Sequence, residues 1–148
     1  MHKSVFITGN SSGIGHALTK QALMPGWSVY GLSRRGCKGL SGDLHDFQCD
    51  LANHQEIVPS LETLLVEVKQ LDYVILNAGV FGEVRKMSQT SIESITKVID
   101  VNVWANKIIL DCLLKSDVHV KHVIAISSGV AVNPYMGWGA YSLSKDMF

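Results

Sequence analysis

The chain alternates between short runs of apolar residues and longer segments in which apolar residues recur every three or four positions. The short runs are rich in β-branched and aromatic residues, which predicts strands at 3–8, 27–32, 47–50, 73–76 and 120–127. The longer segments have the period of an amphipathic helix, which predicts helices at 14–24, 53–69 and 91–114. Pro25 and Gly26 end the first of these helices, and Asn53 is a suitable cap for the second.

Strands that alternate with helices indicate a parallel sheet, because parallel neighbours need a crossover connection. The segment 33–46 has glycines at 36, 39 and 42 and little helical pattern, so we expect it to cross between strands without a full helix. The fold predicted for residues 1–148 is one α/β domain with a doubly wound parallel sheet between two layers of helices. The predicted strand order is 3-2-1-4-5.

Composition excludes several classes of partner. The 148 residues are 47% hydrophobic and 18% charged, with 13 basic and 13 acidic side chains, so no basic field is present to hold nucleic acid or an anionic membrane. No apolar run approaches the roughly 18 residues that a membrane span needs, and the amino-terminal residues have no signal-peptide core. The cysteines at 37, 49 and 112 lie in no metal-binding or CxxC spacing, which favours a reducing cytoplasm. His119 and His122 would point to opposite faces of a strand, so no metal site is predicted.

The glycine-rich segment 8–15, TGNSSGIG, follows the first predicted strand and opens the first predicted helix. Gly9 would permit a tight turn, Gly13 would let a phosphate approach the backbone, and Gly15 would allow the helix to pack closely on the strand. The free amides at a helix start suit a pyrophosphate. The alternative is a glycine-rich turn that binds nothing, but the strand–loop–helix context favours a nucleotide. The residues expected to meet this cofactor are Gly9, Ser11, Ser12, Gly13, Ile14 and Gly15.

The second predicted strand leads into Ser33, Arg34 and Arg35, where a dinucleotide site meets the adenosine ribose. An acidic residue there would mark NAD, whereas a guanidinium pairs with the 2′-phosphate of NADP. Two adjacent arginines are also common in solvated basic loops. Because of their position, we expect NADP(H) to be preferred over NAD(H).

The fourth predicted strand closes on Leu76 and is followed by Asn77, Ala78 and Gly79. This strand lies beside the first, where the winding direction reverses, so its carboxyl end would face the cofactor crevice. Small residues there let the backbone pass close to a ligand. Taken alone, Asn77 could be an ordinary turn residue.

Tyr141 and Lys145 stand four residues apart and would project from one face of a helix. A Y-x-x-x-K match alone has little specificity, but Ser128 and Asn102 precede it. Together with the stretches TGNSSGIG, CDL, LNAG, DVN, ISS and YSLSK, in order and spacing, the chain resembles a classical short-chain dehydrogenase/reductase over its whole length. The resemblance implies a Rossmann-like fold.

The resemblance also implies catalytic roles. Tyr141 would be the general acid, and Lys145 would lower the pKa of Tyr141 and bind the nicotinamide ribose. Ser128 would hydrogen-bond the carbonyl oxygen, and Asn102 would bend its helix and hold a water that links Lys145 to solvent. Without the resemblance, Asn102 could be a surface residue and Ser128 could simply terminate a strand.

For the cofactor, the resemblance implies that the amine of the adenine donates to Asp50 and that the backbone of Leu51 meets the adenine ring. The glycines of the loop would carry the pyrophosphate. The ribose side of the site would be lined by Asn77, Ala78 and Gly79. The complete protein would be a homo-oligomer, either a dimer or a tetramer.

Members of this family are commonly longer, so we expect the chain to end within its active-site helix. Two functions stay open at this point. One is an NADP-dependent oxidoreductase that transfers hydride between NADPH and a small-molecule carbonyl or alcohol, and the other is a truncated nucleotide-binding fragment without catalysis. Tyr135, Met136 and Trp138 are candidates either for the core or for the apolar wall of a substrate pocket.

Overall fold

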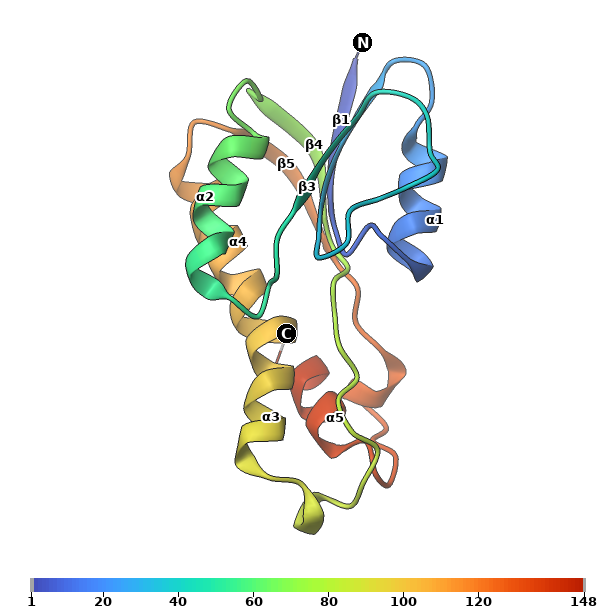
Figure 1. Ribbon diagram of the computed structural model, residues 1–148, viewed down its shortest axis with the longest axis vertical. Helices are drawn as coiled ribbons and strands as arrows, with labels where there is room; N and C mark the ends of the chain where they lie inside the picture. Colours follow the sequence, from blue (N-terminus) through green and yellow to red (C-terminus); the bar gives the residue numbers. More distant parts are fainter. Residues whose placement is uncertain (1, 148) are drawn as a thin grey trace.

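The computed structural model describes residues 2–147, in which five strands alternate with helices (Figure 1). The strands are β1 (Lys3–Thr8), β2 (Trp27–Ser33), β3 (Leu44–Gln48), β4 (Gln70–Leu76) and β5 (His119–Ala125). The α-helices are α1 (Gly13–Ala22), α2 (His54–Leu64), α3 (Ile92–Ile99), α4 (Ala105–Lys115) and α5 (Gly139–Asp146). Three short turns complete the fold: the 3₁₀ turns η1 (Met87–Gln89) and η3 (Gly129–Ala131), and the π-helical turn η2 (Asp100–Trp104).

All neighbouring strands are parallel and follow the order β3-β2-β1-β4-β5, which confirms the predicted sheet. One core lies between the sheet and helices α2 and α4, around Phe6, Leu32 and Val74. A smaller core lies on the opposite face, where Val5 and Ile7 pack with residues of α1. Figure 1 shows α1 on one side of the sheet and α2 with α4 on the other, which is the expected three-layer arrangement.

Several predicted boundaries were wrong, including those of the fourth and fifth strands, which span Gln70–Leu76 and His119–Ala125 instead of 73–76 and 120–127. The third strand was expected at 47–50 but spans Leu44–Gln48, because these residues pair with residues 29–33 of β2. The helix expected at 53–69 ends at Leu64, since the chain must turn there to begin β4 at Gln70. The segment 34–43 contains no helix, as predicted.

The long helix expected at 91–114 is interrupted. Ser91 caps its start by accepting a bond from the amide of Ser94 at 3.1 Å. Helix α3 then passes through the π-helical turn η2 into α4, so the helical axis contains one wide turn centred on Asn102. The resemblance implied a bend at Asn102, which lies in this turn, whereas the hydrophobic period of 91–114 gave no sign of it.

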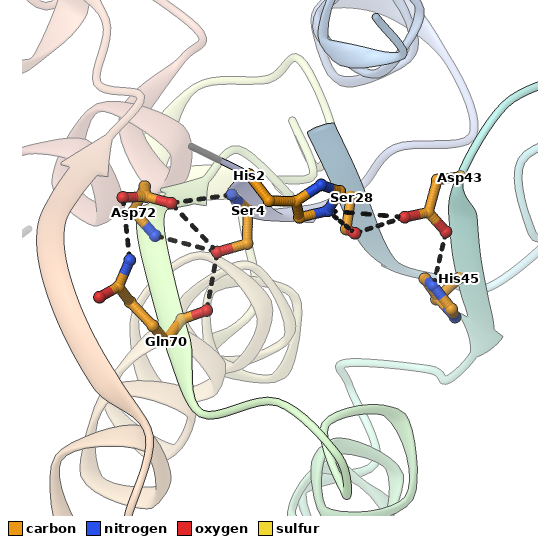
Figure 2. Close-up of polar contacts among 7 residues, drawn as sticks. All are labelled: His2, Ser4, Ser28, Asp43, His45, Gln70 and Asp72. Carbon is orange, nitrogen blue, oxygen red and sulfur yellow. Dashed lines mark hydrogen bonds and ion pairs between the residues drawn. The ribbon is translucent and has the colours of Figure 1, made fainter. Parts of the chain in front are cut away.

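Polar side chains join the strands at their amino ends (Figure 2). The buried Asp72 carboxylate accepts from the backbone amide of Ser4 at 2.9 Å and from the Lys121 ammonium at 2.7 Å, which ties β4 to both of its neighbours. Asp43, just before β3, contacts Ser28 of β2 and accepts from His45 at 2.9 Å. The opposite, carboxyl end of the sheet is the end that faces the glycine-rich loop.

Within residues 2–147, every helix falls short of the length and apolarity needed to cross a bilayer.

Candidate active site

A pocket of about 250 Å³ lies at the carboxyl ends of β1, β2 and β4. Eleven of the residues proposed from the sequence line it, namely Gly9, Ser11, Ser12, Ser33, Arg34, Arg35, Asp50, Leu51, Asn77, Ala78 and Gly79. Five further lining residues were missed by the sequence analysis: Leu32, Cys49, Ala52, Val80 and Val101. All five are direct sequence neighbours of residues that were predicted for the site, and this adjacency was the signal that could have found them.

The glycine-rich loop has the geometry that its sequence predicts. Gly9 has a φ of 70°, and a Cβ there would lie 2.8 Å from the Cα of Ala78. A Cβ on Gly15 would lie 2.3 Å from the carbonyl oxygen of Gly9, so only glycine lets α1 approach β1 this closely. Gly13 also has a positive φ of 55°, and nothing lies within 4 Å of its Cβ position. Gly13 and Ile14 lie at the exposed start of α1 but do not line the pocket.

Asn77 joins the two strands that flank the pocket. Its side-chain amide donates to the carbonyl oxygen of Thr8 at 3.0 Å, and the Thr8 hydroxyl accepts from the backbone amides of Asn77 and Ala78, each at 3.0 Å. Asn77 is therefore more than the ordinary turn residue considered above, because it holds the β4 end against the glycine-rich loop.

Asp50 and Leu51, which follow β3 along the chain, also line the pocket. Asp50 lies on the surface, with one carboxylate oxygen accepting from the amide of Ala52 at 3.1 Å, while Leu51 is buried. The side chains of Arg34 and Arg35 are exposed at the pocket rim. The pocket thus offers backbone amides, one carboxylate and two guanidiniums.

Asn102 is buried and connects three parts of the structure. Its side-chain oxygen accepts from the amide of Val80 at 2.8 Å, and its side-chain nitrogen donates to the carbonyl of Val80 and to the hydroxyl of Ser144, each at 2.9 Å. Ser144 in turn donates to the carbonyl of Tyr141 at 2.7 Å. The π-helical turn therefore anchors both the segment after β4 and helix α5.

Tyr141 and Lys145 lie on helix α5, on the face that the four-residue spacing predicts. The Lys145 ammonium lies 5.7 Å from the centre of the Tyr141 ring and donates to the carbonyl of Ile126 at 2.8 Å. Burial lowers the pKa of the Lys145 ammonium from its ordinary value. A Cβ on Gly79 would lie 3.7 Å from this nitrogen, so the lysine borders the pocket at Gly79.

Ser128 was expected to end the fifth strand, but β5 ends at Ala125 and Ser128 begins the turn η3. Its hydroxyl accepts weakly from the amide of Val130 at 3.5 Å. The turn η3, which Ser128 caps, packs against α5, the helix that carries Tyr141 and Lys145.

Aromatic side chains surround Tyr141. Its ring stacks on Phe81 with the ring centres 4.6 Å apart, and Trp138 meets Phe81 edge to face at 4.4 Å. Tyr135 contacts Trp138 at 5.4 Å and is 63% exposed, so these side chains form an open wall rather than part of the core. Met136 is 86% exposed and lies farther out. Phe81 was missed because it follows the LNAG stretch, far from Tyr141 in sequence.

Together these groups can bind an anionic nucleotide and present a tyrosine whose ring centre lies 5.7 Å from a lysine ammonium. The aromatic wall borders the same tyrosine.

Comparison with known proteins supports this geometry. Residues 3–147 match the family model described as short chain dehydrogenase. The chain is 35% identical over 152 residues to an (S)-benzoin-forming benzil reductase of Bacillus subtilis, covering 96% of this chain and 63% of the relative. It is 33% identical over 162 residues to a benzil reductase of Saccharomyces cerevisiae, covering 98% of this chain and 61% of the relative.

Solved structures agree. A short chain dehydrogenase family protein of Francisella tularensis superposes with a TM-score of 0.89 at 26% identity, covering 99% of this chain and 59% of that protein. A short chain dehydrogenase of Escherichia coli CFT073, solved in complex with NADPH, superposes with a TM-score of 0.79 at 27% identity, covering 98% of this chain and 66% of that protein. The chain thus spans about three fifths of the length of the curated relatives it matches, 63% and 61% for the two reductases.

Proposed function

The chain belongs to the short-chain dehydrogenase family. We propose that the protein acts as an oxidoreductase that transfers hydride between NADPH and a carbonyl or alcohol substrate. One observation carries the proposal: the pocket at the carboxyl ends of β1, β2 and β4 ends at Gly79, beside the Lys145 ammonium. A dinucleotide with its pyrophosphate at the glycine-rich loop would therefore extend toward Lys145 and Tyr141.

The residues present fit a dinucleotide. The space at Gly13 and the pocket amides suit a pyrophosphate, and Asp50 with Leu51 suits the adenine. In this proposal Asn77, Ala78 and Gly79 line the ribose side, while Ser11, Ser12, Ile14 and Gly15 shape the loop around the pyrophosphate. The bound dinucleotide supplies or accepts the hydride, and the protein positions the other reacting groups.

Tyr141 is proposed to donate a proton to the carbonyl oxygen. Lys145, held by the carbonyl of Ile126, places its positive charge near Tyr141 and binds the nicotinamide ribose. Ser128 donates a hydrogen bond to the substrate oxygen and so holds the carbonyl in line. Asn102 places these groups indirectly, because its contacts to Val80 and Ser144 set the position of α5.

NADP(H) is proposed over NAD(H) because Arg34 and Arg35 stand at the pocket rim. A guanidinium fork pairs with a phosphate more strongly than with a hydroxyl. The NADPH complex of the similar Escherichia coli protein supports this choice.

The substrate proposed is a small carbonyl compound that carries an aromatic group. Phe81 and Trp138 flank Tyr141 and offer ring faces and edges to such a group. The two relatives named as benzil reductases support the same class, since benzil is an aromatic diketone.

We also propose that residues 1–148 act as one dinucleotide-binding domain and that the whole protein is a homo-oligomer. Cys37, Cys49 and Cys112 are free thiols, which suits a reducing compartment such as the cytoplasm.

The test is the substitution Tyr141→Phe in the full-length protein. It should lower the rate of NADPH oxidation with an aryl ketone by at least about 100-fold, the usual contribution of a positioned general acid, while NADPH still binds. Tyr135→Phe is the matched control, because it removes the same hydroxyl from an exposed tyrosine that has no proposed catalytic role. Near-normal turnover in Tyr141→Phe would remove this residue from the acid role. Cofactor binding without turnover in the wild-type protein would favour the non-catalytic alternative.

A further inference from the structure

Asp46 connects two loops of the pocket without lining it. It lies on β3, the edge strand, opposite Gly31 of β2. One carboxylate oxygen accepts from the side-chain amide of Asn10 at 2.7 Å, and the other accepts from the backbone amide of Cys37 at 2.6 Å. Asn10 belongs to the glycine-rich loop, and Cys37 follows the arginine pair by two residues.

The contact between Asn10 and Asp46 crosses β2 directly over Gly31. A Cβ at position 31 would lie 2.0 Å from the Asn10 nitrogen and 2.6 Å from the Asp46 oxygen, so a larger residue would break this bridge. Asn10 is fully buried, and its side-chain oxygen has no partner within residues 2–147. The hydrogen bond from its side-chain nitrogen to Asp46 therefore offsets part of the free-energy cost of burying this polar side chain.

The loop that carries Arg34 and Arg35 is held at three points by β3 and by Cys49, the residue that follows it. The amide of Cys49 donates to the carbonyl of Ser33 at 3.0 Å, and the side chain of Gln48 donates to the carbonyl of Arg35 at 3.2 Å. The third point is the bond from the Cys37 amide to Asp46. Gly36 allows this bond, since its φ is +70° and a Cβ there would lie 2.9 Å from the same Asp46 oxygen that accepts from Cys37.

We propose that Asp46 is a positioning residue for NADP(H) selectivity. It holds the loop that carries Arg34 and Arg35 in a fixed position relative to the glycine-rich loop 8–15. The guanidiniums are therefore already in place when the 2′-phosphate binds. A preorganised loop loses less conformational freedom on binding, which strengthens the phosphate contact. The inference rests on the proposed function. It means that a residue outside the pocket contributes to the preference for NADP(H) over NAD(H).

The test compares NADPH and NADH affinities of the full-length protein by titration. Asp46→Ala should weaken NADPH binding by about 5- to 30-fold, the effect of losing two hydrogen bonds, and NADH binding by no more than about threefold. Asn10→Ala, which removes one of the two bonds, should have a smaller effect. His45→Ala is the matched control, because it changes the neighbouring side chain of the same strand, whose contact is with Asp43.

The same substitution in a protein lacking both guanidiniums (Arg34→Ala with Arg35→Ala) separates positioning from general damage. There Asp46→Ala should change NADPH affinity by no more than about threefold, because no guanidinium remains to position. If Asp46→Ala weakened the binding of NADPH and NADH equally, the inference would be overturned. Tighter binding of NADPH by this variant would also overturn it, because Asp46 would then act only by repelling the phosphate. If the wild-type protein binds neither dinucleotide, the proposed function itself fails, and the inference fails with it.

Discussion

Arg34 and Arg35 are the residues at which the two nicotinamide dinucleotides differ most in their expected contacts. NADP carries a 2′-phosphate where NAD has a hydroxyl, and only the phosphate gains a charge-assisted pair from a guanidinium. Both side chains are exposed at the pocket rim, whereas Lys38, in the same loop, does not line the pocket. The position of each cation, rather than its charge alone, is therefore expected to decide its effect.

Arg34→Ala should weaken NADPH binding by about 1–3 kcal/mol, the scale of a charge-assisted hydrogen bond, and leave NADH binding nearly unchanged. Titration of both cofactors into the purified protein measures the two affinities. Lys38→Ala is the control and should change neither by more than a surface substitution does. A loss shared equally by NADPH and NADH would contradict the assignment of a 2′-phosphate site to this loop.

At the scale of the elements, the π-helical turn η2 determines how helix α5 meets the sheet. The turn brings the Asn102 side chain to the backbone of Val80 on one side and to Ser144 on the other. Asn106, one turn later and also buried, donates to the carbonyl of Asn102 at 2.8 Å and so stabilises the widened turn. Helix α5 and the segment after β4 are therefore positioned by one interruption of one helix.

Asn102→Ala should lower the free energy of unfolding by about 2–4 kcal/mol, because it leaves the part-buried amide and carbonyl of Val80 without their partner and opens a small cavity at a buried position. Chemical denaturation monitored by circular dichroism measures this loss. Asn53→Ala is the matched control, because Asn53 stands at the predicted cap position of α2 but its side chain makes no capping bond and donates instead to Glu56 on the exposed surface. It should change stability by no more than about 0.5 kcal/mol. Equal losses in the two variants would show that the turn does not depend on the Asn102 side chain.

At the scale of the whole molecule, the two ends of the sheet have different roles. Polar clusters around Asp72 and Asp43 join the strands at the amino end (Figure 2), and the candidate site occupies the carboxyl end. Asp72 is buried, whereas the side chain of Asp43 is 48% exposed. The hydrogen bond from Lys121 is the main reason that the pKa of Asp72 falls from 3.8 to about 2.

This lowered pKa predicts how stability depends on acid. The charged Asp72 stabilises the fold fully above the ordinary carboxyl pKa, and the contribution is lost as the pH falls from about 4 toward 2. Asp72→Asn should therefore cost about 1–2 kcal/mol at pH 7 and progressively less toward pH 2, measured by urea unfolding at several pH values.

Asp43→Asn is the comparison at the same end of the sheet. The Ser28 hydroxyl is the main group that lowers the pKa of Asp43, but solvent screens this half-exposed carboxylate, so the substitution should have a smaller effect. If the loss in the free energy of unfolding caused by Asp72→Asn did not change with pH, the charge of Asp72 would not be the source of its contribution to stability.

The sequence by itself determined the features that depend on neighbouring residues. Strand β1 was predicted with its observed bounds, and the alternation of strands and helices indicated the parallel sheet. The glycine-rich loop was predicted because Gly9 and Gly15 must allow close contacts that any larger residue would prevent. Periodicity, turn chemistry and glycine spacing all act within a few residues, so they can be read along the chain.

Only the tertiary structure decided the features that depend on residues far apart in sequence. Pairing with β2 placed β3 at Leu44–Gln48, and contacts to Val80 and Ser144 accompany the wide turn at Asn102. Packing brought Phe81 onto the Tyr141 ring, 60 positions further along the chain. The bridge from Asn10 to Asp46 likewise joins residues 36 positions apart. Each of these contacts forms only when the sheet has aligned its strands, because the geometry between distant residues has no local sequence pattern.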